Sequence, residues 1–421
     1  MDLRRSIYFL STPTLITIII VSFISEITHI TQPIFFAIPL LPYIIFTVAL
    51  IMAFIFNNNR EFMILVLLSV LYWVINNLIF NSNSLLNPDQ REQLTHYITF
   101  LLPLNFVVFS FTKERGVLSR YGQQQLAIVV AQIIIVTLLL RFPVTAISTL
   151  FNIQYLSILS HRSVYIPQLS IISFEFSLLV LASIIIHQPS IRQGGFFGCL
   201  IFVFLSFLNF DNPDAFTLFY ALAGLVLISA IVFNSYTLAY HDELTGLSSR
   251  RALKQYLMSL GPSYTLAMVD VDHFKSVNDT HGHDVGDQVL RQLAGYLRNA
   301  PGGAKAYRYG GEEFTLVYNN KSATEAAEYA NQLRRQIEKD TFNIRNTNDR
   351  PKRTRRHKKS ATQNKNKPST MKKLHYTVSI GISEHREHHK TPFDTLKSSD
   401  KALYSAKQKG RNCVVIAKGK K

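Results

Sequence analysis

The chain has 421 residues, of which 48% are hydrophobic and 17% charged, and its formal net charge is +17. An average soluble domain carries roughly a quarter charged residues, so a single ordinary soluble globule is excluded. The apolar content, the ordinary amounts of Gly and Pro and the presence of only two cysteines also exclude overall disorder, a collagen-like fibre and a disulfide scaffold.

Charge is divided unevenly along the chain. Residues 1–236 hold 10 Lys/Arg and 9 Asp/Glu, whereas residues 237–421 hold 34 Lys/Arg and 18 Asp/Glu. We therefore predict an integral membrane module, sensory or anchoring, over 1–236. A short helical junction is expected over 237–248 and a soluble domain over 249–421.

The first half contains several stretches long enough to cross a membrane, which takes about 20 mostly apolar residues as a helix. We predict about eight spans, with one or two more or fewer left open: 6–24, 34–56, 62–80, 97–112, 125–141, 169–187, 195–210 and 215–236. With the amino terminus inside, the inner loops hold seven Lys/Arg and the outer loops three. Positive charge favours the cytoplasmic side, so both termini are expected in the cytoplasm.

Polar residues also occur within these predicted spans. Glu175 falls in the sixth span, and Asn76 and Asn77 interrupt the third. An ionisable residue at membrane depth is a candidate for function. The favoured interpretation is structural, with Glu175 protonated or hydrogen-bonded inside the bundle and the asparagines linking helices.

In the second half the hydrophobic periodicity alternates between helix and strand. We predict helices at 249–260, 322–340 and 392–409, with helical turns over 274–299, and strands at 264–272, 305–309, 314–319, 376–383 and 412–417. This order is the split βαβ (ferredoxin-like) pattern, an α+β fold with an antiparallel sheet and helices on one face.

A basic stretch interrupts that pattern at about 346–373. Residues 350–373 hold 11 Lys/Arg and no Asp/Glu. Such a block repels itself and lacks apolar residues, so we predict a solvated, disordered loop. Binding to anionic lipid headgroups is the next interpretation. No specific nucleic acid is expected, because the stretch has no interleaved aromatic residues.

Acidic residues follow one predicted strand and precede another. Asp270 and Asp272 end the strand at 264–272, and Glu312 follows the pair Gly310-Gly311, a hairpin signal that is expected to need positive φ. If the hairpin pairs beside the first strand, Asp270 and Glu312 can share a cation. Oxygen ligands of this kind suit Mg²⁺ bound together with substrate phosphates.

A basic pair lies near the end of the last predicted helix. Lys407 and Arg411 are four residues apart, with Gly410 as the expected helix cap. On one helix face these two cations can neutralise a polyphosphate.

The run Gly310-Gly311-Glu312-Glu313-Phe314 resembles the signature of the GGDEF family of diguanylate cyclases, in its Glu form. The other blocks of the family are also present, in the family's order along the chain: Asp242–Arg250, Asp270–Lys275 and Asn278–Asp287 before the signature, and Val378–Ser383 and Lys407–Asn412 after it. The resemblance covers about 240–418. The membrane half matches only the habit of such enzymes of carrying a multi-span N-terminal module.

The resemblance implies a palm-like domain and an enzyme, a nucleotidyltransferase, acting as a homodimer. Two GTP would condense into cyclic di-GMP and two pyrophosphates. The implied metal is Mg²⁺, with Mn²⁺ as an alternative, held by Asp270, the Val271 carbonyl, Glu312 and Glu313. Glu312 would also accept the proton of the 3′-hydroxyl.

The resemblance also implies residues that bind the nucleotide. Lys275 would stabilise charge developing on the phosphates. Asn278 and Asp287 would read the guanine edge and His283 would contact the nucleotide, or only the local turn. Lys407 and Arg411 would hold the triphosphate. The implied location is the bacterial inner membrane, with the catalytic domain in the cytoplasm.

Two alternatives remain beside this interpretation. The domain could be catalytically silent and relay a signal by binding a nucleotide or a partner, or it could be another type of cyclase, making cyclic AMP or GMP. Many relatives carry an Arg-x-x-Asp product-inhibition site five residues before the signature. Here the stretch is Pro301-Gly302-Gly303-Ala304, so we do not expect feedback inhibition through that site.

Overall fold

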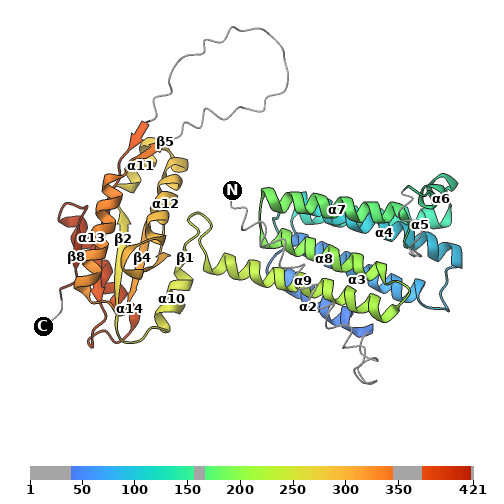
Figure 1. Ribbon diagram of the computed structural model, residues 1–421, viewed down its shortest axis with the longest axis horizontal. Coiled ribbons are helices and arrows are strands. Elements are labelled where there is room, and N and C mark those ends of the chain that lie inside the picture. Colours follow the sequence, from blue (N-terminus) through green and yellow to red (C-terminus); the bar gives the residue numbers. More distant parts are fainter. Residues whose placement is uncertain (1–38, 156–165, 345–371, 419–421) are drawn as a thin grey trace, which may run out of the picture. The chain divides into compact units, whose positions relative to one another are not determined.

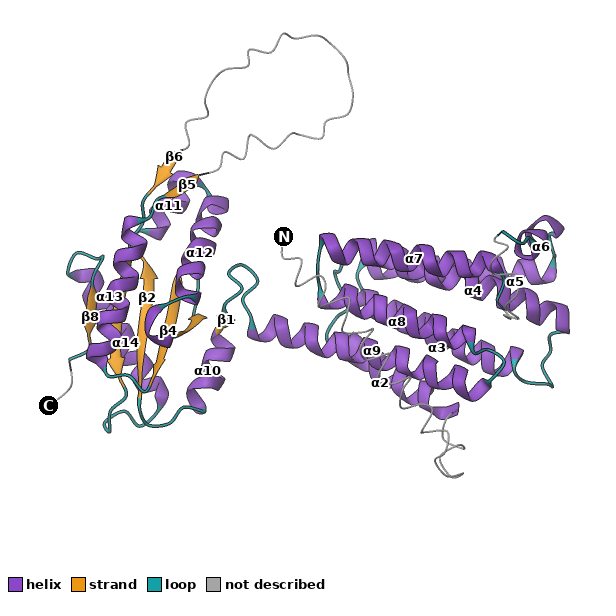
Figure 2. Cartoon of the chain, in the orientation of Figure 1, coloured by secondary structure: helices purple, strands orange, loops and turns teal. Residues whose placement is uncertain are grey.

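The computed structural model describes residues 39–155, 166–344 and 372–418 (Figure 1). The chain divides into two compact units, Met1–Tyr236 and Thr237–Lys421. The first is helical and the second combines helices with strands (Figure 2). Each unit is described by itself.

The helical unit is built from long apolar helices in sequence order. They are α2 (Leu41–Ile55), α3 (Asn59–Val74) with its π-helical extension η2 (Ile75–Ile79), α4 (Pro88–Phe111), α5 (Arg120–Arg141), α6 (Thr145–Asn152), α7 (Gln168–His187), α8 (Ile191–Leu208) and α9 (Pro213–Tyr240). Their core is rich in aromatic residues, for example Tyr72 and Tyr220, whose ring centroids are 5.6 Å apart.

Six of these helices are long and apolar enough to cross a membrane, among the residues that the structure describes: α3 with η2, α4, α5, α7, α8 and α9. The prediction of eight spans is thus only partly supported. The predicted span 6–24 lies outside the described residues, and the span predicted at 34–56 corresponds to α2, which has only 15 residues. Between the spans predicted at 125–141 and 169–187 the structure has the eight-residue helix α6.

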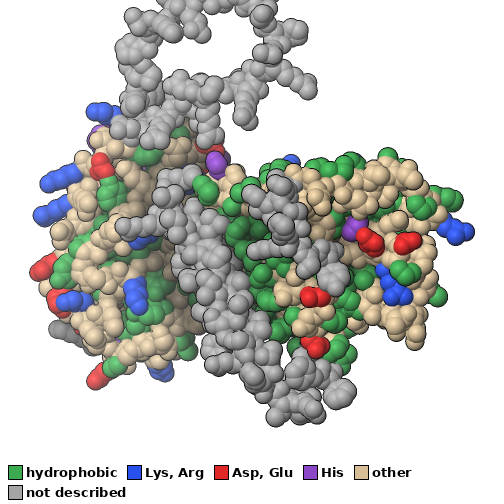
Figure 3. Space-filling model, turned by 45° about the vertical axis from the view of Figure 1, so that its right-hand side comes forward, with side chains coloured by type: hydrophobic (Ala, Val, Ile, Leu, Met, Phe, Trp, Pro, Cys, Tyr) green, Lys and Arg blue, Asp and Glu red, His purple; other side chains and the backbone are tan. Residues whose placement is uncertain are grey.

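The outward faces of the helical unit are apolar. Leu179 is 71% exposed and Ile55 is 68% exposed, and hydrophobic side chains are visible across the face shown in Figure 3. Exposed apolar surface on this scale is unfavourable in water and suits the hydrocarbon of a bilayer. The helical unit is therefore that of a membrane protein.

The structure corrects the interpretation of the polar residues in this unit. Glu175 is exposed on α7 rather than inside the bundle, and Asn77 donates to the Trp73 carbonyl of its own helix rather than to a neighbour. The buried carboxylate is Glu61, which lies 2.9 Å from Arg192 of α8. Arg192 also reaches Glu114 at 2.6 Å, so the ion pairs join α3, α8 and the segment after α4.

The second unit is an α+β domain, as predicted. Its elements are β1 (Ser248–Ser249), α10 (Arg250–Met258), β2 (Tyr264–Val271), α11 (Phe274–His281), α12 (His283–Arg298), η4 (Pro301–Gly303), β3 (Lys305–Arg308), β4 (Glu313–Asn319), α13 (Ala323–Lys339), β5 (Phe342–Ile344), β6 (Lys372–Leu374), β7 (Val378–Glu384), α14 (Pro392–Gln408) and β8 (Val414–Ile416). The predicted elements are confirmed to within two residues at each end.

The main sheet has the strand order β1-β3-β4-β2-β7-β8. Its four inner strands pair antiparallel, as expected, but the edge strands β1 and β8 pair parallel with β3 and β7. Helices lie on both faces rather than on one. One core joins α12 and α13 to the sheet and a second joins α10 and α14 to it. The expectation of helices on one face was therefore wrong, and the uniformly buried β2 shows why, because both of its faces are covered.

The basic stretch sits between two short strands that the sequence did not predict. β5 and β6 pair antiparallel, with Phe342 opposite Leu374 and Ile344 opposite Lys372. Residues 345–371, which hold most of the predicted loop at 346–373, lie outside the described residues. The hairpin nevertheless fixes where this stretch leaves and rejoins the domain.

Candidate active site

Asp270 lies where the central strand meets both of its neighbours. It is the second-last residue of β2 and only 3% exposed. It faces Glu313, the first residue of β4, on one side and Ser379 of β7 on the other. The strands β3 and β4 form a hairpin whose turn carries the signature run from Gly310, and we call it the signature hairpin. Its predicted pairing beside β2 is present, with Glu313 rather than Glu312 directly opposite Asp270.

A lysine from the last helix reaches the same carboxylate. Nζ of Lys407 in α14 is 2.9 Å from Oδ1 of Asp270. Burial raises the pKa of Asp270 to about 6; Lys407 opposes this rise, while the charges of Glu312 and Glu313 add to it. Three acidic groups around one buried position favour an incoming cation.

The signature hairpin is held by Arg308, at the end of β3. Its Nη2 and Nε donate to the Gly311 carbonyl at 2.7 and 3.2 Å, and its Nη1 donates to Oδ1 of Asp242 at 2.7 Å. Burial alone would raise the pKa of Asp242, but hydrogen bonds from Thr245 and Arg308 outweigh it and hold that pKa below its ordinary value. Arg308 thus ties the turn at Asp242–Leu247 to the signature turn.

Of the two glycines of the signature, Gly311 leaves open space beside the turn, and neither provides a left-handed backbone conformation. Neither Gly310 nor Gly311 has a positive φ, so the predicted need for a left-handed residue here was wrong. A Cβ atom on Gly311 would meet nothing within 4 Å. The backbone of the turn is therefore open to a ligand.

Asp272, the second acidic residue predicted at the end of this strand, has a structural role. β2 ends at Val271, and the buried Asp272 carboxylate accepts hydrogen bonds from the hydroxyls of Thr377 and Ser379 and from the backbone N–H of Asn412. It thereby fixes the turn after α14 to β7. The sequence contained no local sign of this link, because Asn412 is 140 residues away.

The candidate nucleotide residues occupy two consecutive helices. Lys275 and Asn278 lie on α11, and His283 and Asp287 on α12. The helices are separated by Gly282, whose φ of +84° breaks them apart. Asn278 lies against α12 so closely that a Cβ atom on Gly286 would be 1.9 Å from its Oδ1. Gly286, next to Asp287, is a positioning residue that the sequence analysis did not identify.

The structure brings together only some of the predicted site residues. Asp270, Glu312, Glu313 and Lys407 meet at the end of β2. Among the described residues, no hydrogen bond or ion pair joins the residues of α11 and α12 to Asp270. Arg411 does not share a face with Lys407, because α14 ends at Gln408 and Arg411, with φ +65°, lies beyond Gly410. Arg411 is exposed, within reach of solvent-borne anions.

The oxygen atoms at the end of β2 are of the chemical type that binds a divalent cation. Carboxylates of Asp270, Glu312 and Glu313 and the Val271 carbonyl are the hard donors that Mg²⁺ prefers. Within the described residues, no three His, Cys, Asp or Glu side chains form a ready-made metal cluster. Mg²⁺ commonly binds through one or two carboxylates together with substrate phosphates and water.

A concavity lies on the face of the sheet that α10 and α14 cover. It has a volume of about 510 Å³, and its lining includes Glu313 and the cations Arg250, Lys254 and Lys397. The guanidinium of Arg250 lies over the Tyr309 ring, 4.4 Å from its centroid. The sequence analysis gave these cations no role, although they line the concavity together with Tyr309 and Glu313.

The stretch without Arg-x-x-Asp forms the short helix η4. Gly302 has a φ of +78°, and a Cβ atom there would be 2.4 Å from the Tyr329 ring. Tyr329 of α13 therefore packs directly on this turn.

Comparison with known proteins agrees with these motifs. The family model described as the GGDEF domain of diguanylate cyclases matches residues 239–354 and 342–413. Diguanylate cyclase VdcA of Vibrio cholerae is 36% identical over 185 residues, which is 42% of this chain and 47% of that protein. Response regulator PleD of Caulobacter vibrioides is 33% identical over 190 residues, covering 43% and 37%.

Two further similar proteins are a membrane protein and a protein of known structure. An uncharacterised membrane protein of Staphylococcus haemolyticus is 29% identical over 185 residues, covering 42% of this chain and 45% of that protein. The crystal structure of the coiled coil and GGDEF domain of DgcB from Caulobacter crescentus, in complex with cyclic di-GMP, aligns at 28% identity and a TM-score of 0.39, covering 47% and 95%. The chain spans less than half the length of the curated relatives named here.

Fold and site together define a membrane protein with an α+β domain built around a signature hairpin. Through residues 239–413 the chain belongs to the GGDEF family.

Proposed function

We propose that the protein is a membrane-bound diguanylate cyclase. It condenses two GTP into cyclic di-GMP and two pyrophosphates, depends on Mg²⁺ and acts as a homodimer. The observation that carries the proposal is the register that sets the buried Asp270 opposite Glu313 of the signature hairpin, with Lys407 2.9 Å from Asp270. The named cyclase VdcA among the relatives supports the same activity.

The chemistry divides between residues around β2 and residues on the helices. Asp270, the Val271 carbonyl, Glu312 and Glu313 would hold Mg²⁺, which would supply positive charge to offset that of the reacting phosphate. Glu312 takes the proton of the 3′-hydroxyl, whose oxygen forms the new bond to the α-phosphate of the other GTP as pyrophosphate leaves. Lys275, Lys407 and Arg411 bind the phosphates electrostatically.

Guanine recognition is assigned to the two consecutive helices. Asn278 on α11 and Asp287 on α12 offer an amide and a carboxylate, which complement the donors and acceptors of guanine. Asp287 lies next to Gly286, against which Asn278 packs, so the two side chains come from adjoining positions. His283, the exposed first residue of α12, is the candidate contact to the rest of the nucleotide.

The experiment is product analysis with the full-length protein in lipid nanodiscs. GTP and Mg²⁺ should yield cyclic di-GMP on chromatography, and Glu312→Gln should lower turnover by about 10² to 10⁴, the usual contribution of a general base. Glu328→Gln, on the exposed face of α13, is the matched control and should leave turnover unchanged. GTP binding without product would instead favour a silent relay domain, and cyclic GMP would favour another cyclase.

Regulation by the membrane module is part of the proposal. α9 runs without a break from Pro213 to Tyr240, and the turn at Asp242 follows directly. Deleting residues 1–236 should therefore lower cyclase activity and weaken dimerisation. Full activity in a monomeric truncation would contradict this. We place the protein in the bacterial inner membrane with its catalytic domain in the cytoplasm, where GTP is available.

The basic stretch is proposed to bind anionic lipid headgroups. Because β5 and β6 pair, residues 346–371 can be replaced by a short Gly/Ser turn without separating their ends. This variant should keep its activity but lose salt-sensitive binding of the detergent-solubilised protein to vesicles containing phosphatidylglycerol. Equal vesicle binding by both forms would exclude the stretch as the contact.

A further inference from the structure

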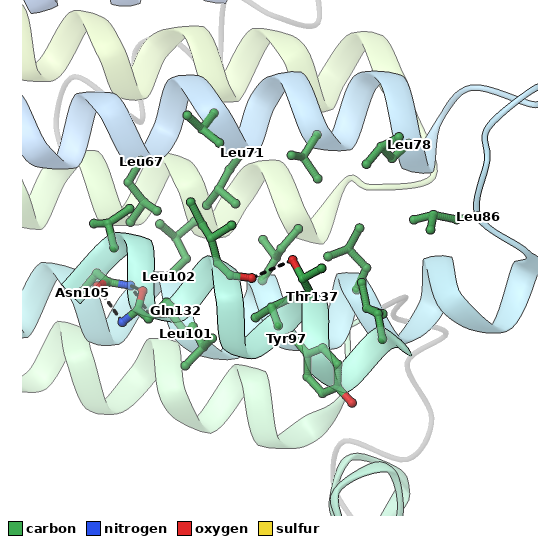
Figure 4. Close-up of a pocket in the computed structure, with 18 residues that line it drawn as sticks. Leu67, Leu71, Leu78, Leu86, Tyr97, Leu101, Leu102, Asn105, Gln132 and Thr137 are labelled. Carbon is green, nitrogen blue, oxygen red and sulfur yellow. Dashed lines mark hydrogen bonds between the residues drawn. The ribbon is translucent and has the colours of Figure 1, made fainter. Parts of the chain in front are cut away.

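The helical unit contains a cavity of about 320 Å³ between α3, α4 and α5 (Figure 4). Its lining runs over equal lengths of the three helices, from Leu67 to Leu78, from Leu94 to Asn105 and from Val129 to Leu140. Eleven residues of helix rise about 16 Å. The cavity is therefore long and narrow and follows the direction of the helices.

The lining is mostly apolar. Its polar members are Tyr97, Thr137, whose hydroxyl donates to the Ile133 carbonyl of its own helix, and an amide pair at one end. Asn105 and Gln132 exchange two hydrogen bonds there, at 3.0 and 3.1 Å. The second N–H of Asn105 is used by the Leu101 carbonyl. Among the described residues Gln132 makes no other hydrogen bond, so one amide N–H and a free lone pair on each amide oxygen remain for a ligand.

The cavity opens toward the membrane. Three of its lining residues are exposed apolar side chains: Val70 at 40%, Ile133 at 48% and Leu86 at 96%. Of the six candidate spans, α5 is the least buried. A molecule dissolved in the hydrocarbon can therefore enter without crossing water.

We propose that this cavity binds a neutral, single-tailed lipid-phase molecule with one hydroxyl or carbonyl group. The tail fills the apolar length, and the polar group pairs with the amides of Asn105 and Gln132. A charged head is excluded because none of the described residues that line the cavity is charged, and an unpaired charge there is costly.

The shape of the cavity selects the occupant. A helix with its side chains is about 10–12 Å wide, which is too wide for about 320 Å³ spread over this length. Hydrocarbon gains little on leaving one apolar medium for another. Specificity must therefore come from the fit of the tail and from hydrogen bonds at the amide pair.

The test is photolabelling of the full-length protein in nanodiscs with a diazirine-bearing 1-dodecanol. Adducts should concentrate on the lining of α4 and α5 when read by mass spectrometry. Excess 1-dodecanol and 2-dodecanone distinguish a hydroxyl from a carbonyl head by which of them competes better. Dodecane, which lacks a polar group, and dodecanoate at pH 8, which is charged, should compete at least fivefold less well.

Two variants separate the cavity from general exposure to lipid. Val136→Trp fills the cavity and Gln132→Leu removes the amide, so each should reduce labelling at least fivefold. The control is Ile134→Trp, because Ile134 is 54% exposed on the outer face of the same helix. Uniform labelling of lipid-facing residues without competition would overturn the proposal. No labelling of the lining at all, as when residues 6–24 fill the space, would overturn it too.

Discussion

Arg308 and Asp242 form an ion pair of 2.7 Å that joins the turn after α9 to the signature hairpin. The same guanidinium donates twice to the Gly311 carbonyl, so one side chain holds both segments. A planar fork of donors suits this task, and a lysine cannot reproduce it. The position of the signature turn therefore depends on a residue outside the signature itself.

Arg308→Lys should lower kcat about tenfold or more, because a hydrogen bond to a charged group contributes about 1.5–3 kcal/mol and a factor of ten corresponds to about 1.4 kcal/mol. Steady-state cyclic di-GMP production measures this. Arg335→Lys, at an exposed position on α13, is the control and should be neutral. Adding Asp242→Asn to Arg308→Lys should cost less than the two single losses combined; strict additivity would show that the two residues act separately.

The pKa of Asp270 predicts an acid limit to activity. Burial raises it to about 6, and only the ionised carboxylate attracts a cation. At low Mg²⁺ the rate should therefore fall as the pH drops through about 6, and higher Mg²⁺ should move this limit to lower pH. Lys407→Met removes the cation that opposes the rise, so its limit should lie at higher pH. A limit that ignores both changes would contradict the assignment.

The same pKa predicts that Asp270→Asn stabilises the protein while abolishing activity. Between the ordinary pKa of 3.8 and about 6, the folded state binds more protons than the unfolded state. Without metal, stability should therefore fall as the pH rises through this window. Calorimetry of the full-length protein at pH 7.5 should show a higher Tm for Asp270→Asn, and at pH 4 the difference should disappear. A lower Tm at pH 7.5 would contradict the raised pKa.

The long elements of the α+β domain were predictable because their patterns are local. β2 is a continuous apolar run, and α13 begins with the capping box Ser322 to Glu325. β1, β5 and β6 have two or three residues each, too few to show a periodicity. The two-sided cover of the sheet was missed because edge strands and helix placement are set by tertiary packing.

The candidate site was partly predictable for the same reason. Asp270, Glu312 and Lys407 stand in recognisable runs of residues. Arg308 was missed because its partner Asp242 is 66 residues away. The structural role of Asp272 was missed because one of its hydrogen-bond donors, Ser379, is 107 residues away. Contacts between distant segments leave no periodic trace in a single sequence, so such positioning residues become visible only in the fold.

Asp272→Asn should loosen the turn that carries Arg411. The carboxylate accepts three hydrogen bonds in a buried position, and an amide replaces one acceptor oxygen by a donor that faces other donors. We expect a loss of about 1–3 kcal/mol in the free energy of unfolding. Hydrogen exchange should also quicken in residues 409–413. Wild-type exchange there, despite lower stability, would show that the turn does not depend on Asp272.

Gly286→Ala should weaken nucleotide binding by displacing Asn278. A Cβ atom at this position would lie 1.9 Å from the Asn278 Oδ1, so the amide must leave its place. KM for GTP should rise about tenfold or more, since losing one good hydrogen bond contributes roughly 1 kcal/mol and misplacement of the amide adds to it.

Gly295→Ala is the matched control on the same helix. A Cβ atom there would meet nothing within 4 Å, so this change should leave KM unaltered and stabilise α12 by about 0.5–1 kcal/mol. Both substitutions replace Gly by Ala on α12 and raise its helix propensity equally. A rise in KM that only Gly286→Ala shows therefore reports on binding and not on the stability of the helix. If both variants raise KM alike, general stiffening of α12 explains the loss and Asn278 is not the residue that reads the nucleotide.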